Sequence, residues 1–116
     1  MENKPTRHYS KLQEEKVANY LGGTLTPNSG AKHKKGDILL KDTIVECKTK
    51  TKQSTSHTVK EEWMHTLQKE CIEMGKMNWA IIFDFGTQKL NDQYAIIPIV
   101  DYKEYLNLKG GTKCLE

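Results

Sequence analysis

The sequence predicts an α/β fold in which α-helices flank a central mixed β-sheet. Helix-forming and strand-forming segments follow one another in the order α-β-β-β-α-β-β-α, as expected of a layered sheet-and-helix domain. The segment 78–86, "NWAIIFDFG", is almost continuously apolar, which is typical of a central strand covered on both faces. With 116 residues, of which 36% are hydrophobic and 28% charged, the chain is expected to form one globular domain, 1–116.

A first helix is predicted over about residues 10–21. The "SKLQ" at its start fits a capping box, and the two glycines after it fit a helix stop. Val17, Ala18 and Leu21 give this helix one apolar face. A short strand around 24–26 is expected next, followed by the polar loop "PNSGAKHKKG".

Two strands, 37–40 and 43–49, are predicted to form a hairpin around the two-residue turn "KD". In that register Asp37 lies opposite Glu46, and both side chains project to the same face of the sheet. Lys48, two residues beyond Glu46, shares that face. Charged residues of these types are disfavoured in strands, so their presence here calls for a reason.

A second helix is predicted from residue 58 to about 76, beginning with the capping box "TVKE". Its apolar stripe consists of Trp63, Leu67, Cys71 and Met74. A later strand over 93–100 is expected at a sheet edge, because Pro98 cannot donate a hydrogen bond to a neighbouring strand. Asp101 is predicted to cap a short final helix, which contains Tyr102, Tyr105 and Leu106.

The positive charge of the chain is concentrated around the hairpin. The net charge is +3, but residues 32–52 hold seven lysines against three acids, a local net charge of +4. Such a field suits a polyanion, and nucleic acid before a membrane surface. The alternative is a solvated lysine-rich loop with no partner.

Several other classes of protein are disfavoured. No apolar run approaches membrane-spanning length, and the N-terminal segment has no signal-peptide core, so the cytoplasm is the expected location and no membrane partner is expected. Cys47, Cys71 and Cys114 show no CxxC spacing, which argues against a disulfide framework or a zinc finger. No glycine-rich nucleotide loop or serine-histidine triad is evident.

Opposed carboxylates in a hairpin repel each other and destabilise the sheet, so something should offset their repulsion. A Mg²⁺ ion would do so, since it takes one or two carboxylates together with waters and phosphate oxygens. Lys48 could then orient a metal-bound water or stabilise charge on phosphate. Glu14 lies on the apolar face of the first helix and should point towards the sheet. The alternatives are a surface ion cluster for Glu46 and Lys48, and a boundary glutamate for Glu14.

These residues resemble the PD-(D/E)XK nuclease superfamily. The matching elements are Glu14 on the first helix, "GD" at 36–37 and "ECK" at 46–48. Within the superfamily, the chain is most similar to small Holliday junction resolvases of the archaeal type and their viral relatives, which also place a basic loop containing glycine and serine before the aspartate strand. The resemblance covers about residues 10–100. Gly36 departs from the proline that names the motif, and Cys47 fills its variable middle position.

The resemblance implies a restriction-endonuclease-like fold and metal-dependent phosphodiester hydrolysis. Asp37 and Glu46 would be direct Mg²⁺ ligands assisted by the carbonyl of Cys47, and Mn²⁺ is expected to substitute. Lys48 would position the attacking water, and Glu14 would hold a metal or a metal-bound water. The residues expected to bind DNA phosphates are Ser29, Lys32, Lys34, Lys35, Lys50 and Lys52.

The leading hypothesis is therefore a structure-selective endonuclease of DNA recombination, a Holliday junction resolvase, with a virus-encoded origin as one possibility. A general nicking or end-processing nuclease is the first alternative, and a catalytically inactive nucleic-acid-binding module is the second. Resolving a junction needs two incisions, so a twofold homodimer is expected. Its surface is placed at Tyr94, Ile97, Ile99, Tyr102, Tyr105 and Leu106.

A few further residues carry weaker expectations. Trp63 is expected in the core rather than as a platform for bases, and Gln68 on the surface. His57 and His65 form no recognisable metal pair with any cysteine. His33, in the basic loop, could contact phosphate, but a solvent-exposed loop histidine is the favoured interpretation. Asp84, inside an apolar strand, is either at a sheet edge or a helper acid.

Overall fold

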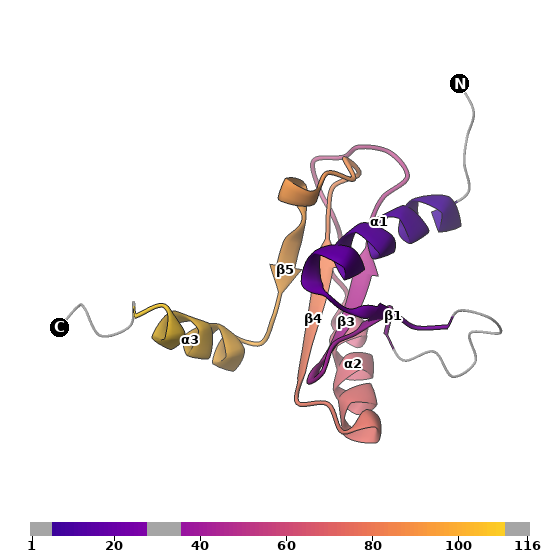
Figure 1. Ribbon diagram of the computed structural model, residues 1–116. Coiled ribbons are helices and arrows are strands. Elements are labelled where there is room, and N and C mark those ends of the chain that lie inside the picture. Colours follow the sequence, from indigo (N-terminus) through magenta and orange to yellow (C-terminus); the bar gives the residue numbers. More distant parts are fainter. Residues whose placement is uncertain (1–5, 28–35, 111–116) are drawn as a thin grey trace.

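The computed structural model describes residues 6–27 and 36–110, and the side chains from residue 8 onward within them. The described residues form a five-stranded mixed sheet and three α-helices (Figure 1). The elements are α1 (Thr6–Leu21), β1 (Thr24–Leu25), β2 (Ile38–Leu39), β3 (Thr43–Lys48), α2 (Glu61–Met74), β4 (Asn78–Phe83), the 3₁₀ turn η1 (Leu90–Asp92), β5 (Tyr94–Ile96) and α3 (Ile99–Leu108). The predicted α/β class and element order are confirmed.

The strands lie side by side in sequence order, β1-β2-β3-β4-β5. Only β3 and β4 run parallel, because α2 forms the crossover between them, and every other pair is antiparallel. β4 is paired on both sides, which confirms its predicted central position, and β5 lies at the edge.

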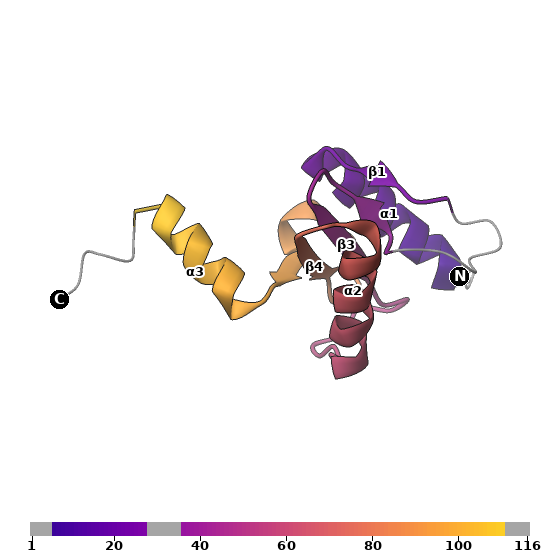
Figure 2. The same cartoon turned by 90° about the horizontal axis from the view of Figure 1, so that it is seen from below.

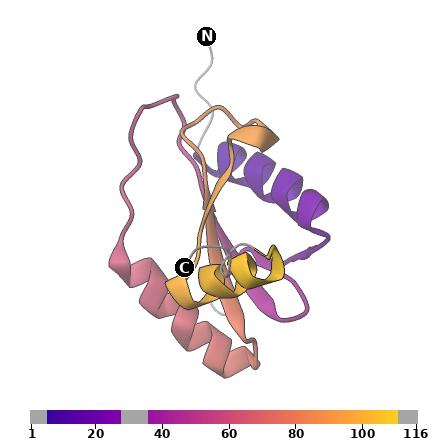
Figure 3. The ribbon, with the colours of Figure 1, turned by 90° about the vertical axis from the view of Figure 1, so that its left-hand side faces the viewer.

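Helices α1 and α2 cover opposite faces of the sheet (Figure 3). Side-chain alternation along β3 sends Val45 and Cys47 towards α1, whereas Ile44 packs towards α2. The first face buries Val17, Ala18, Ile38, Val45 and Cys47. The second face buries Ile44, Leu67, Cys71, Trp79 and Ile81. The two predicted helical stripes therefore build two separate halves of the core, except for Leu21, which is 40% exposed.

Both predicted capping boxes are wrong. Helix α1 begins at Thr6, so Ser10 lies inside it rather than at its start. Helix α2 begins at Glu61 with Lys60 as an extended N-cap that forms no side-chain hydrogen bond. Glu61 and Glu62 instead place negative charge in the first turn, which suits the helix dipole.

The C-terminal boundary was also placed wrongly by the sequence pattern. The expected strand over 93–100 ends at Ile96, and α3 begins at Ile99 with Pro98 as its N-cap. Proline has no N–H for the sheet and a fixed φ, here −59°, that suits the start of a helix. Asp101 therefore lies in the first turn of α3 rather than at its cap.

Helix α3 does not cover the sheet. Figures 1 and 2 show it extending away from the body formed by the other elements. No residue of α3 is buried in the described chain. The expectation that the final helix also flanks the sheet is therefore wrong. No helix within residues 6–27 and 36–110 is both long and apolar enough to cross a membrane.

Candidate active site

The pairing of Ile38 with Val45 and of Leu39 with Ile44 confirms the predicted hairpin register within β2 and β3. Asp37 directly precedes β2, and Glu46 follows Val45 on β3. The Asp37 N–H donates a hydrogen bond to the Val45 carbonyl at 2.9 Å, one residue out of that register, so regular pairing ends before Asp37 while its backbone stays against β3. Asp37 is only 2% exposed, whereas Glu46 is half-buried. A buried carboxylate thus lies beside a partly solvated one.

The Asp37 carboxylate is fixed against the backbone of β3. Its Oδ2 atom accepts a hydrogen bond from the Cys47 N–H at 2.7 Å. The adjoining Gly36 has φ of +72°, a value that neither proline nor most L-residues adopt. A Cβ atom there would also clash with Cγ2 of Ile44. The positive φ and the clash with Ile44 together explain why glycine, and not proline, precedes Asp37 in this chain.

Lys48 is held at the site by two partners. Its Nζ atom lies 3.3 Å from Oε2 of Glu46 and 4.4 Å from the ring centroid of Trp63. Trp63 comes from α2, and its half-buried ring packs on the α2-side core. Trp63 packs against the core, as expected. Its contact with the Lys48 ammonium was not predicted from the sequence. Residues 44, 46 and 48 of β3 point to the face of the sheet that α2 covers. This two-residue periodicity was the sequence signal for a contact between Lys48 and α2.

Glu14 lies half-buried on α1. Among the residues that the structure describes, no group of three or more His, Cys, Asp or Glu side chains is arranged to hold a metal ion. Glu14 therefore does not join Asp37 and Glu46 in a three-carboxylate cluster in this arrangement.

The donor set at the hairpin fits a hard divalent cation. Asp37 and Glu46 supply carboxylate oxygens, which Mg²⁺ prefers and of which it needs only one or two from protein. The Cys47 thiol is buried in the α1-side core, on the other face of β3 from Glu46, so only the Cys47 backbone is available to the site. No soft ligand therefore competes with the oxygens.

A buried polar network that the sequence did not predict supports the end of β3. Asp84 is fully buried, and its carboxylate accepts hydrogen bonds from the Thr49 hydroxyl, the Gly86 N–H and Gln93 Nε2. Gln93 Oε1 in turn accepts a hydrogen bond of 3.0 Å from Gln13 Nε2. Asp84 thus has a structural task. Because it follows the interior strand β4, the expectation of a sheet edge is wrong, whereas a role as helper acid stays a prediction.

Gln13 connects this network to the site. Its Nε2 atom also donates to the Lys48 carbonyl at 2.9 Å, and Gln13 is almost fully buried. Because Gln13 precedes Glu14 on α1, the contact fixes that part of α1 against the strand end that carries Lys48. Two features of the sequence were signals of this network. Gln13 lies on a half-apolar helix, and Asp84 interrupts an apolar segment.

The other candidate residues from the sequence lie at different places in the fold, and some lie outside the described part of the chain. His57 donates from Nδ1 to the Asp84 carbonyl at 2.7 Å and meets the Phe83 ring edge-on, which anchors the chain after β3. Gln68 is exposed on α2, as expected. Lys50 is half-buried and Lys52 exposed, both just beyond Lys48. The residues that lie outside the described part of the chain are Ser29, Lys32, His33, Lys34, Lys35 and Cys114.

Cys71 is not suited to nucleophilic or metal chemistry. Burial raises the pKa of its thiol, and the negative charge of Glu70 raises it further. The thiol donates to the Asn78 carbonyl at 3.3 Å within the α2-side core. The protonated, packed form is therefore the stable one.

Comparison with known proteins adds no relative. No protein-family model, curated protein or solved structure matches this chain. The functional argument therefore depends on the residues and contacts of the site itself.

Proposed function

We propose that this chain is a Mg²⁺-dependent, structure-selective DNA endonuclease with a restriction-endonuclease-like fold. The observation that carries the proposal is the buried Asp37, hydrogen-bonded to the backbone of Val45 and Cys47 on either side of Glu46, with the Lys48 ammonium 3.3 Å from that glutamate. Neighbouring carboxylates repel each other; the Lys48 ammonium offsets part of this repulsion, and a bound Mg²⁺ would offset more of it and give the two acids a catalytic use. The element order around the hairpin supports the same fold.

Each side chain has a defined task in this proposal. Asp37 and Glu46 would hold Mg²⁺ with help from the Cys47 carbonyl, and the ion would lower the pKa of a bound water and neutralise phosphate charge. Lys48 would orient the attacking water and stabilise the charge that develops on the phosphate. Trp63 limits the positions open to the Lys48 ammonium.

DNA is the proposed substrate because the site lies within the basic part of the chain. Lys50 and Lys52 follow β3 directly, where their positive charge can meet the phosphates flanking a cut. A four-way junction is the proposed target, cut by a homodimer that supplies one site per incision.

The test compares a labelled four-way junction with a linear duplex of the same sequence. We expect symmetric cuts near the branch point with Mg²⁺ or Mn²⁺, no cuts with a chelator, and little cleavage of the linear duplex. Equal cleavage of both substrates would favour the nicking or end-processing alternative. Tight DNA binding with no cleavage in either metal would favour the inactive binding module.

A further inference from the structure

Helix α3 lacks the packing that a helix of its length needs. It has ten residues, and isolated helices shorter than about 12–15 residues are marginal in water. Its apolar side chains are nevertheless open to solvent, including Ile99 at 80% and Tyr102 at 49% exposure. A surface that covers α3 would account for both facts.

One side of α3 forms a continuous apolar stripe. At 3.6 residues per turn, four side chains fall within about a third of the helix circumference: Ile99, Tyr102, Tyr105 and Leu106. The rings of Tyr102 and Tyr105 stack, with centroids 6.0 Å apart and planes at 19°, so the two aromatic side chains lie together on the stripe. Val100 and Leu108 project from the other side of the helix.

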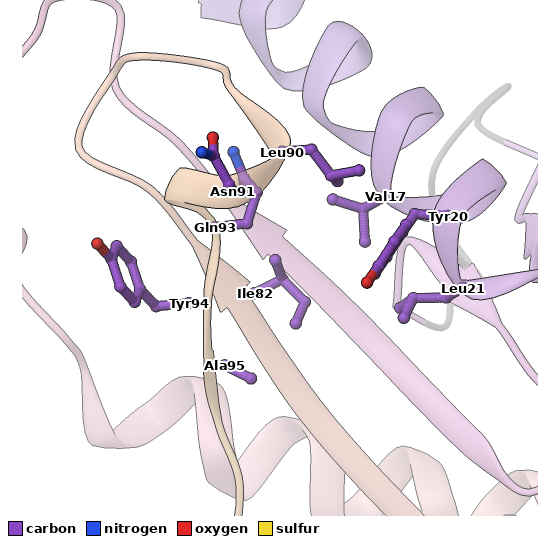
Figure 4. A pocket seen from close by; sticks show the side chains of 9 residues that line it. All are labelled: Val17, Tyr20, Leu21, Ile82, Leu90, Asn91, Gln93, Tyr94 and Ala95. Carbon is purple, nitrogen blue, oxygen red and sulfur yellow. The ribbon is translucent and has the colours of Figure 1, made fainter.

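The same chain carries an open apolar groove. It has a volume of about 620 Å³ and lies between α1 and the η1–β5 segment at the edge of the sheet (Figure 4). Its lining includes Val17, Tyr20, Leu21, Ile82, Leu90 and Tyr94. Tyr20 is 70% exposed and Tyr94 50% exposed, so the aromatic rings beside the groove are accessible from outside.

The connection between β5 and α3 directs the helix away from this groove. Only Ile97 and Pro98 separate the two elements. Proline fixes its own φ and holds the preceding residue extended, so this two-residue link is stiff. Figures 1 and 2 show α3 pointing outward from the sheet edge as a result. The helix therefore leaves its own groove uncovered.

We propose that α3 of each chain docks in the groove of a second copy, so that two chains exchange their last helices about a twofold axis. The argument is that the described chain carries both an apolar helix stripe and an apolar groove, and a single twofold operation covers both in both copies. This inference deepens the proposed function, which calls for two active sites, but it rests on α3 and the groove alone.

The areas involved are those of a stable dimer. From the exposed fractions, each stripe offers the equivalent of about two fully exposed large side chains, roughly 300–500 Å². Two stripes and the groove surfaces that they cover then bury roughly 1,200–2,000 Å² in total, the size of a standard specific interface.

The test is sedimentation velocity of the full chain over the micromolar range. We expect a species of twice the 13.3 kDa chain mass. The stripe variant Ile99→Glu/Tyr102→Glu should weaken the dimer roughly a thousandfold, because a twofold interface contains each substitution twice. The matched control Val100→Glu/Leu108→Glu adds the same charge to exposed positions on the other side of the same helix and should remain dimeric.

A mixing experiment then tests the exchange itself. The groove variant Tyr20→Glu/Leu90→Glu should be monomeric, as the stripe variant should be. Mixed together, the two should associate again, because the intact helix of one fits the intact groove of the other. A monomeric wild type, a control as weak as the stripe variant, or no association on mixing would each overturn the exchange. Loss of DNA cleavage with assembly intact would instead affect only the proposed nuclease function.

Discussion

The side chain of Asp37 and the backbone N–H of Cys47 are joined by a hydrogen bond of 2.7 Å. This bond links the aspartate before β2 to the middle residue of the "ECK" segment on β3, so the two parts of the motif hold each other in place. It also gives a buried acid a polar partner, as the low dielectric of a protein interior requires. The geometry of the candidate site is thus partly built by the motif itself.

Two substitutions of Asp37 should separate its structural task from its proposed chemical one. Asp37→Ala leaves the Cys47 N–H buried without its acceptor and should lower the free energy of unfolding by about 1–3 kcal/mol. Asp37→Asn keeps an oxygen that can accept this hydrogen bond, so it should lower the free energy of unfolding much less. Urea denaturation of both variants measures the difference, and equal losses would show that the bond contributes little.

Gly36 should tolerate substitution poorly, for two reasons that a control can separate. Gly36→Ala strains the backbone at φ +72° and places a methyl group against Ile44. Gly75 has a similar φ of +68° but open space around it, so Gly75→Ala should cost about 1–2 kcal/mol from the backbone alone. We expect a clearly larger loss for Gly36→Ala in thermal or urea denaturation. Equal losses would mean that the neighbouring side chain moves aside.

Asp84 should contribute to stability rather than to cleavage chemistry. Asp84→Ala removes the acceptor for three hydrogen-bond donors in a fully buried position, so unfolding should become easier by about 3 kcal/mol or more. Asp42→Ala removes an exposed acid from the hairpin turn and should change stability by less than about 0.5 kcal/mol. Wild-type stability in Asp84→Ala would contradict this role.

Trp63 should influence cleavage through Lys48. An exposed cation–π contact is worth about 0.5–1 kcal/mol, so Trp63→Leu should slow cleavage roughly two- to fivefold under saturating DNA. Trp63→Phe keeps an aromatic face and should recover part of that rate, whereas Lys48→Ala should lose activity. Identical cleavage rates for Trp63→Leu and Trp63→Phe would show that the contact between Trp63 and Lys48 does not influence cleavage.

Local patterns were sufficient to predict the elements that build the site. The alternation along 43–49 gave the register of the hairpin, and the helical periodicity around Leu67 gave the buried face of α2, because both follow from backbone geometry alone. The predicted starts of α1 and α2 were wrong because several residues near Ser10 and Thr58 can act as N-caps. Tertiary packing decides where each helix begins.

Contacts between distant parts of the chain could not be predicted in this way. Gln13 and Gln93 are 80 residues apart, and Lys48 reaches Trp63 only because α2 folds across its face of the sheet. No local pattern places such pairs together. The outward direction of α3 likewise depends on the Ile97–Pro98 link and on the rest of the sheet edge rather than on the helix sequence.

The most direct test of the central claim is Mg²⁺-dependent cleavage of a four-way junction by Asp37→Asn and Glu46→Gln. Each change removes a carboxylate proposed to hold the ion, so cleavage should fall at least about a hundredfold while junction binding stays equal or tightens. Asp42→Asn removes the same charge from the exposed turn of the same hairpin and should cut at the wild-type rate. Near-normal cleavage by either site variant would contradict the proposed metal site.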